Sequence, residues 1–457
     1  MTEIKFDLSL RGNKIKRMNA VNNGPTSPGV RNVPTNFDAY KALEIPYARN
    51  HDASFYTPYG GEHIVDVHRI FKDFSADEND PESYIFEPTD KYLQNTINAG
   101  TKIFYRLGAS IEHGYKYGTR VPKDFAKWAR ICEHIIRHYN EGWANGFEWG
   151  IDYWEIWAEP DCRNADGSNP CWQGTEEQFI EFYTVAAKHL KKCFPNIKVG
   201  GPAFASVYSS GFNDRFLDSV VRLNTPLDFY SYHWYGKNIG YDTEIEDGLK
   251  VSFADCIKAV RDQLDSRGLT KTETVLNEWN YIYGWSGESW AYSLRSEKNL
   301  KGASFALGAM CAAQAGPLDM LMYYDARPCG MNGLFATNTY KCLKPYYSFA
   351  AFNELVKLGT EIPCELSAVD IYSCAATNGK DSAVVLTYFN DDESSCEREV
   401  KVSFANKSGK KRVICCYLDE MNDLEPIREE IFTADEFSLY LKMPLYTSVL
   451  IKIEGII

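Results

Sequence analysis

Short apolar runs alternate with amphipathic stretches between residues 17 and 358, and this alternation constrains the fold more than any other feature. Residues 125–139 and 179–190 carry apolar side chains at helical spacing, which predicts helices there. Strands that alternate with helices form a parallel sheet, because each parallel strand needs a crossover connection to the next. The expected strands are Arg17–Val21, Tyr47–Asp52, Lys102–Leu107, Tyr153–Ala158, Lys198–Gly201, Phe229–His233, Thr274–Glu278 and Asp319–Tyr324.

Eight strands are the number that closes a barrel, so the expected fold class is α/β, a (β/α)8 TIM barrel. After residue 359 the pattern changes to short alternating runs separated by Asn, Asp, Gly and Ser, which predicts a β-sandwich. Residues 4–10 also alternate and need a sheet to join. We therefore expect residues 1–15 to join the C-terminal β-sandwich of residues 359–457, and residues 16–358 to form the barrel that carries the site.

The charge balance argues against a nucleic-acid partner. With 49 Lys and Arg against 62 Asp and Glu the net charge is −13, and no basic run exceeds Lys410–Arg412.

No stretch of about 20 uncharged apolar residues occurs, so we expect no membrane span. Charged residues interrupt residues 1–20, where a signal peptide would need an apolar run, and the expected location is the cytoplasm. The oligomeric state, including a homo-oligomer, stays open.

The 13 cysteines are odd in number and have no repeating spacing, which is atypical of a disulfide framework, so we expect reduced thiols. Cys162 and Cys171, which bracket a loop rich in Gly, Asn and Asp, are the one pair that merits inspection. His134 and His138 stand four apart on an expected helix, a spacing that can bind zinc, but no Glu lies between them. We interpret both as surface histidines, and we expect no metal and no cofactor.

Two glutamates stand where apolar strands end, at the face of a barrel that carries active sites. Glu159 follows the expected fourth strand, and Glu278 ends the seventh. Burial beside aromatic residues would raise a carboxyl pKa, as a general acid requires, while a second, ionised carboxylate nearby can act as nucleophile. The pair therefore predicts a retaining glycosidase. The alternative for each glutamate is a buried salt bridge with an arginine such as Arg49.

Other strand ends add polar and aromatic candidates for binding a carbohydrate substrate. Tyr235 is expected to donate to Glu278 and keep it ionised, with a core or rim position as the alternative. Trp157, Trp234 and Trp279 are interpreted as walls that stack on sugar rings, with barrel packing as the alternative for Trp157. The complete set of expected substrate-binding residues is Arg49, His51, Trp157, His233, Tyr235, Trp279, Asn280, Tyr324 and Asp325.

These motifs resemble glycoside hydrolase family 39, the β-xylosidase and α-L-iduronidase family of the retaining (β/α)8 clan. Trp154–Pro160 is similar to the family's Trp-x-x-Trp-Asn-Glu-Pro segment after strand four. Asn277–Asn280 fits the segment that holds the family's nucleophile at the end of strand seven. The resemblance implies that Glu159 is the acid/base, that Glu278 is the nucleophile and that the substrate is a carbohydrate.

Further similarity extends the resemblance over most of the chain. His51 is similar to the family's strand-two histidine, and His233 and Tyr235 to its strand-six histidine and tyrosine. Gly200–Pro202 on strand five and Lys344–Tyr347 before the last helix are also similar. The trailing β-sandwich fits the organisation that the family implies.

The sequence departs from the family at Ala158, where most of the clan has an Asn whose amide binds the sugar 2-hydroxyl. Either Asn280 or Asn277 supplies this contact, or the substrate differs at that carbon, or activity is weak. The expected reaction is hydrolysis of a terminal β-xyloside-like or related neutral glycoside, since the acidic segment Asp242–Asp247 disfavours uronates. The alternatives are a carbohydrate-binding barrel with weak or no hydrolysis, and a transglycosylase.

Overall fold

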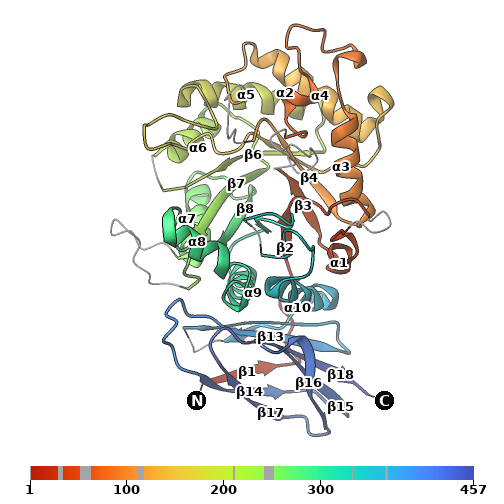
Figure 1. Cartoon of the computed structure of the whole chain (residues 1–457), viewed down its shortest axis with the longest axis vertical. Helices are drawn as coiled ribbons and strands as arrows, with labels where there is room; N and C mark the ends of the chain where they lie inside the picture. Colours follow the sequence, from red (N-terminus) through yellow and green to blue (C-terminus); the bar gives the residue numbers. More distant parts are fainter. Residues whose placement is uncertain are drawn as a thin grey trace.

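The computed structural model describes residues 2–28, 34–51, 63–110, 118–208, 211–240, 252–331, 333–365 and 369–456. Asp52 and the acidic segment Asp242–Asp247 lie outside the described residues. Eight parallel strands close into a barrel in chain order, which confirms the predicted fold class (Figure 1). The strands are β2 (Arg17–Asn22), β3 (Tyr47–Asn50), β4 (Lys102–Leu107), β5 (Tyr153–Ile156), β6 (Lys198–Phe204), β7 (Phe229–Gly236), β8 (Glu273–Tyr281) and β9 (Met320–Tyr323).

Helices surround the barrel (Figure 1). The predicted helix of residues 125–139 begins where Asp124 accepts a hydrogen bond from the Lys127 amide and ends at Gly142, whose left-handed backbone (φ 71°) stops it. Among the helices that the structure describes, none is both long and apolar enough to cross a membrane. The α-helices are α1 (Phe37–Ala42), α2 (Val67–Ile70), α3 (Glu87–Asn98), α4 (Phe125–Glu141), α5 (Glu176–Cys193), α6 (Phe212–Arg222), α7 (Phe253–Ser266), α8 (Gly287–Ser296), α9 (Leu300–Ala315) and α10 (Lys344–Leu358), and the 3-10 helices are η2 (Pro81–Ser83) and η3 (Trp143–Asn145).

A layer of apolar side chains fills the barrel toward the amino ends of its strands. Within it, Phe104, Tyr153 and Phe229 pack together with ring centroids 5.1 to 5.5 Å apart. The polar residues at the carboxyl ends of the strands therefore lie above a closed, packed floor. The layer comprises Ala20, Tyr47, Phe104, Tyr153, Phe229, Val275, Met320 and Met322.

Two packed sheets form the C-terminal β-sandwich around an apolar core. β1 (Thr2–Asp7) pairs in parallel with β14 (Arg398–Ala405), so the N-terminal strand joins this sandwich as predicted. It ends at Asp7 rather than at residue 10, because the Asp7 carboxylate accepts a hydrogen bond from the Ser9 amide and turns the chain. The first sheet has the order β11 (Cys364–Glu365), β1, β14, β17 (Phe437–Met443), and the second has the order β10 (Thr360–Glu361), β12 (Ile371–Thr377), β13 (Ser382–Tyr388), β18 (Ser448–Gly455), β15 (Lys411–Leu418), β16 (Asp423–Phe432).

Helices α9 and α10 lie between the barrel and the sandwich and pack on β12 and β13 (Figure 1). Almost every residue of α9 is buried, because barrel and sheet cover opposite sides of it, and its sequence is accordingly small and apolar. At Gly308 a Cβ atom would lie 2.7 Å from Ile239 Cδ1 and 3.1 Å from Tyr372 Cδ2, so a larger residue would require these side chains to shift. The Ser304 hydroxyl donates to the Tyr388 carbonyl at 2.7 Å and ties the helix to β13.

The interpretation of His138 as a surface histidine is wrong. His138 is buried and stacks on Phe86 with ring centroids 3.6 Å apart. Its Nε2 lies 3.1 Å from Asp90, and its Nδ1 lies 2.8 Å from the Trp143 carbonyl oxygen. The reason is helical spacing, since position 138 falls on the same face of α4 as the buried Ile131 and Ile135. His134 is half buried, with Nδ1 2.9 Å from a carbonyl oxygen of its own helix.

Candidate active site

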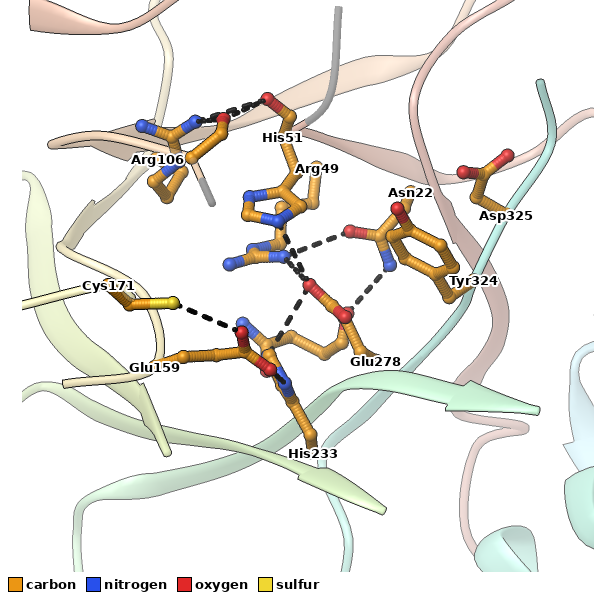
Figure 2. A network of polar contacts seen from close by, with 12 residues as sticks. Asn22, Arg49, His51, Arg106, Glu159, Cys171, His233, Glu278, Tyr324 and Asp325 are labelled. Atoms are coloured by element: carbon orange, nitrogen blue, oxygen red, sulfur yellow. Dashed lines mark hydrogen bonds and ion pairs between the residues drawn. The ribbon is translucent and has the colours of Figure 1, made fainter. Parts of the chain in front are cut away.

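Polar side chains from several barrel strands converge at their carboxyl ends (Figure 2). Glu278 on β8 is nearly buried, at 5% exposed. Arg49 Nη1 donates to Glu278 Oε1 at 2.7 Å, and the Tyr235 hydroxyl donates to Oε2 at 2.9 Å. His51 Nε2 lies 3.4 Å from the same Oε1. Donors on both oxygens therefore fix the orientation of Glu278 and favour its carboxylate form.

Arg49 on β3 joins Glu278 to Glu155, a fully buried carboxylate of β5. Its Nε donates to Glu155 Oε2 at 2.6 Å, and its Nη1 also donates to Asn22 Oδ1 at 3.1 Å. Burial disfavours the charged guanidinium, but Glu155 and Glu278 outweigh burial and raise the pKa of Arg49. The buried salt bridge considered from the sequence is thus present at Glu278, together with the other contacts of that carboxylate.

Glu159 reaches the site through an unusual backbone. β5 ends at Ile156, and the Trp157 amide then donates to the Leu107 carbonyl at 2.7 Å while the Glu159 amide donates to the Ala203 carbonyl at 2.8 Å. Trp157 (φ 75°) and Glu159 (φ 51°) adopt the left-handed region that side-chain-bearing residues rarely occupy. The resulting turn presents the Glu159 carboxylate, whose side chain is 22% exposed.

His233 on β7 connects the two carboxylates (Figure 2). Its Nδ1 lies 3.0 Å from Glu159 Oε1, and its Nε2 lies 3.5 Å from Glu278 Oε1. One oxygen of each carboxylate and a ring nitrogen of His233 all lie within 4.8 Å of one another. Burial disfavours the imidazolium, but Glu278 and Glu159 outweigh burial and raise the pKa of His233. The resting site therefore favours a charged histidine between two carboxylates.

The expectation that burial raises the pKa of Glu159 is wrong for the resting protein. Burial does act in that direction, but the hydrogen bond and charge of His233 outweigh it, and the pKa of Glu159 is lowered. Cys171 and Arg49 act in the same direction as His233. A proton held at this point therefore belongs to the Glu159–His233 pair rather than to Glu159 alone.

The three tryptophans interpreted as stacking walls face away from the carboxylates. Trp157 is buried against aromatic residues of α4 and α5, and its Nε1 donates to the Cys171 carbonyl at 2.9 Å. Trp279 and Trp234 pack against aromatic residues of α7 and α9. Side chains alternate along a strand, so Trp279 must face outward when its neighbour Glu278 faces inward. The interpretation of Trp157, Trp234 and Trp279 as sugar-binding walls is therefore corrected to packing of the barrel against its helices.

The asparagines considered for the contact that Ala158 lacks have other partners. Asn277 Nδ2 donates at 2.6 Å to the buried Glu155 carboxylate beneath the site. Asn280 Nδ2 donates to the Tyr324 carbonyl at 2.8 Å. Both side chains are buried, so the structure gives Asn280 a supporting position rather than a surface for substrate.

Tyr324 and Asp325, which follow β9, occupy different positions (Figure 2). The Tyr324 ring lies beside His51, with ring centroids 6.4 Å apart. Asp325 is fully buried and accepts hydrogen bonds from Arg327 Nε at 3.0 Å and Nη2 at 2.8 Å. Tyr324 therefore lies at the site, whereas Asp325 supports the loop behind it.

Three side chains at or beneath the site were not assigned to it from the sequence. Trp285 is 59% exposed, contacts the Tyr235 ring edge-on at 5.2 Å and stacks on Trp290 at 5.5 Å. It follows a glycine outside any strand pattern, so no strand signal marked it. Cys171 Sγ donates to Glu159 Oε2 at 3.6 Å, a contact that depends on the fold of a loop. Glu155 offered a usable signal, since a charge within an apolar strand needs a buried partner.

Three groups of side chains in the described part of the chain have the mutual spacing, within 4.8 Å, that a shared metal ion requires. At the site, the Arg49 guanidinium forms an ion pair with Glu278, and His233 lies 3.0 Å from Glu159. Both carboxylates therefore have partners within the protein. We assign no metal to these groups. They are Glu133, His189 and Cys193; Glu159, Cys162 and Cys171; and Glu159, His233 and Glu278.

Solved structures share this fold over the whole chain. A glucosidase from Croceicoccus marinus superposes with a TM-score of 0.78 at 21% identity, with 100% of both chains covered. A monomeric β-xylosidase from Caulobacter crescentus CB15 superposes with a TM-score of 0.70 at 16% identity, again with 100% of both chains covered. At these identities the likeness establishes the barrel and sandwich architecture.

Sequence comparison identifies the family. A β-xylosidase from Caldicellulosiruptor saccharolyticus is 26% identical over 215 residues, which cover 43% of this chain and 41% of that protein. A β-xylosidase from Geobacillus stearothermophilus is 25% identical over 178 residues, 36% of this chain and 33% of that protein. The chain thus matches less than half the length of these relatives. The model of glycosyl hydrolases family 39 matches residues 51–291, more than half of the 457 residues and including both glutamates of the site. The chain belongs to glycosyl hydrolases family 39.

Proposed function

We propose that the protein is a retaining glycoside hydrolase that removes a terminal sugar from a neutral, β-xyloside-like glycoside. In this proposal Glu278 is the nucleophile and Glu159 is the acid/base. Family membership supports the reaction class, and the two relatives named β-xylosidases support the substrate class.

One observation carries the retaining mechanism. Oxygens of Glu159 and Glu278 lie within 4.8 Å of each other. Retaining glycosidases hold their two carboxyl groups about 5–5.5 Å apart, whereas inverting enzymes need about 6.5–9.5 Å to fit a water molecule between nucleophile and sugar. The spacing favours direct attack by a carboxylate.

The reaction then proceeds in two displacements. Glu278 attacks the anomeric carbon, the bond to the leaving oxygen breaks, and Glu159 gives that oxygen a proton. In the second step Glu159 takes a proton from water, whose oxygen attacks the same carbon and releases Glu278. His233 contacts both carboxylates, so it exchanges a proton with Glu159 as the charge of Glu278 disappears and returns.

Neighbouring groups position the substrate and the nucleophile. Arg49 and Tyr235 orient Glu278, and burial, followed by the Glu278 charge, raises the pKa of Tyr235 so that its hydroxyl stays a donor. Among the described residues, Nη2 of the buried Arg49 has no hydrogen-bond partner. Because Arg49 is as fully buried as Asn280, it supports Glu278 from beneath and is not the donor that replaces the one Ala158 lacks. His51 and Tyr324 complete the sugar-facing polar surface, and the exposed Trp285 offers an aromatic face to a ring.

The test is a panel of nitrophenyl glycosides that includes β-xyloside, α-arabinopyranoside, β-galactoside and β-glucoside. Glu278→Ala and Glu159→Ala should each abolish turnover, while Glu397→Ala, at an exposed glutamate of the sandwich, keeps the wild-type rate. NMR of the first product should show the same anomer as the substrate. With azide present, Glu159→Ala should form a glycosyl azide of retained configuration, because azide replaces the water that needs a base.

Wild-type rates in either glutamate variant would contradict the assigned roles. Sugar binding in calorimetry without turnover of any glycoside would instead indicate a carbohydrate-binding barrel. Transfer of the sugar to an added alcohol in preference to water would indicate a transglycosylase.

A further inference from the structure

Two cysteines flank the loop that follows Glu159, and the proposed mechanism uses neither. The sulfur atoms of Cys162 and Cys171 and one Glu159 carboxylate oxygen all lie within 4.8 Å of one another. Both cysteines are in the thiol form. A disulfide bond joins sulfur atoms about 2.05 Å apart. Closing the remaining gap requires rotation of the two side chains and a movement of the loop between them.

The two thiols differ in how firmly they are held. Cys171 is 2% exposed, its amide donates to Asn169 Oδ1 at 2.8 Å, and its carbonyl accepts from Trp157 Nε1 at 2.9 Å. Cys162 is half buried, and an exposed turn follows it, in which the Asn164 amide donates to the Ser168 carbonyl at 2.8 Å. A small reagent can therefore react with Cys162 first, because Cys171 is less accessible.

The electrostatics favour the same order of reaction. The neighbouring Cys171 side chain lowers the pKa of Cys162, although burial opposes this. The neighbouring Cys162 side chain and burial both raise the pKa of Cys171. Since the thiolate is the nucleophile in thiol–disulfide exchange, Cys162 is the attacking residue and Cys171 the resolving residue.

We propose that Cys162 and Cys171 form a reversible disulfide beside the acid/base carboxylate. The oxidant is a small-molecule disulfide. The Cys162 thiolate attacks one of its sulfurs and releases a first thiolate, which gives a mixed disulfide. Cys171 then attacks the Cys162 sulfur and releases the second thiolate. Overall the two protein thiols are oxidised, and their two hydrogens leave on the two small thiols.

Oxidation changes the surroundings of Glu159, an effect that rests on the proposed function. In the dithiol form Cys171 Sγ donates to Glu159 Oε2 at 3.6 Å. A disulfide sulfur carries no hydrogen, so Glu159 loses a donor that favours its charged form. The Glu159–His233 pair then releases its proton at higher pH. The alkaline limb of the kcat/KM profile should move upward in the oxidised enzyme.

The first experiment measures the bond without any activity assay. The full chain is incubated with oxidised glutathione, quenched with acid and mapped by mass spectrometry without reduction. Trypsin cleaves after Arg163 and separates the two cysteines, so the bond appears as a cross-linked peptide pair. Dithiothreitol should abolish the pair, as should Cys162→Ser, whereas Cys396→Ser, at an exposed cysteine of the sandwich, should leave it unchanged. A wild-type protein without this peptide pair would overturn the proposal.

The second experiment separates the loss of the donor from oxidation. In reduced enzyme, Cys171→Ala should shift the alkaline limb upward as oxidation does, and Cys171→Ser, which keeps a donor, should restore it. An unmoved limb in both the oxidised enzyme and Cys171→Ala would overturn the effect on Glu159. If no glycoside is hydrolysed at all, the proposed function fails while the cross-linked peptide still decides whether the disulfide forms.

Discussion

Removal of one hydroxyl, in Tyr235→Phe, separates the two chemical steps of the proposed mechanism. The Tyr235 hydroxyl donates to Glu278 Oε2 at 2.9 Å, and its ring packs edge-on against Trp285 at 5.2 Å. Phenylalanine keeps the ring and its packing, so the change removes the hydrogen bond alone. The hydrogen bond stabilises Glu278 mainly while its carboxylate is charged, because an esterified oxygen is a weaker acceptor.

The expected magnitude follows from this bond. A hydrogen bond to a charged group contributes about 1.5–3 kcal/mol, and each 1.36 kcal/mol changes a rate tenfold, so the affected step should slow about 10- to 150-fold. That step is release of the glycosyl-enzyme, in which Glu278 regains its charge as the bond to sugar breaks. Its formation, in which Glu278 loses charge, should slow much less. We therefore expect kcat and KM to fall together, while kcat/KM for an aryl glycoside with a good leaving group changes little.

The assay is stopped-flow release of nitrophenol from an activated glycoside. Tyr235→Phe should show a burst equal to the enzyme concentration, followed by the slow steady state. Tyr388→Phe is the matched control, since that hydroxyl donates to a backbone carbonyl in the sandwich at 2.9 Å, and it should leave the kinetics unchanged. An unchanged kcat, or a higher KM without a burst, would refute the assignment of Tyr235 as the donor to the nucleophile.

Three further variants probe the site and the stability of the barrel. Arg49→Met removes the cationic partner of two buried carboxylates and should lower the free energy of unfolding by about 3–5 kcal/mol. Arg412→Met, at an exposed ion pair, should lower it far less, and equal losses in urea titrations would contradict this. Trp285→Ala should raise KM up to about tenfold with a smaller effect on kcat, and Trp285→Phe should restore most of the lost affinity. An unchanged KM across the glycoside panel would exclude a contact between Trp285 and substrate. The pKa of His233 is raised above 6.5 in the folded protein, so its contribution to stability is complete below pH 6.5 and is lost as pH rises through the folded-state pKa. His233→Asn should flatten this decline in stability, and parallel curves of unfolding free energy against pH for wild type and variant would contradict the prediction.

The order of elements was predictable from local patterns. All eight barrel strands and the N-terminal strand of the sandwich appear where apolar runs indicate them. Strand ends at the site were less predictable. β7 extends to Gly236 and β8 to Tyr281, beyond the predicted ends at His233 and Glu278, because the added residues pair across the sheet, as Tyr235 does with Asn280. Pairing with the neighbouring strand, rather than hydrophobicity, extends these strand ends. The sequence of one strand does not show which strand it pairs with.

The direction in which side chains point at the site also could not be predicted from local sequence patterns. The tryptophans beside the two glutamates are close in sequence, yet they face the surrounding helices. Trp157 turns away because the left-handed backbone redirects the chain after β5. Trp285, which does lie exposed beside Tyr235, comes from a loop with no periodic signal. Aromatic composition therefore indicated neither which rings reach the site nor which ones pack the barrel.

The amino-acid sequence by itself determined the α/β barrel, the attached sandwich and the presence of two glutamates at strand ends, because hydrophobic periodicity and strand order are local properties of the chain. Only the tertiary structure decided which groups surround those glutamates. Arg49 meets Glu278 across 229 positions of sequence, and His233 lies 3.0 Å from Glu159 and lowers the pKa that burial alone would raise. Electrostatic and hydrogen-bond energies depend on distances of a few ångströms, which exist only once the strands have closed into the barrel.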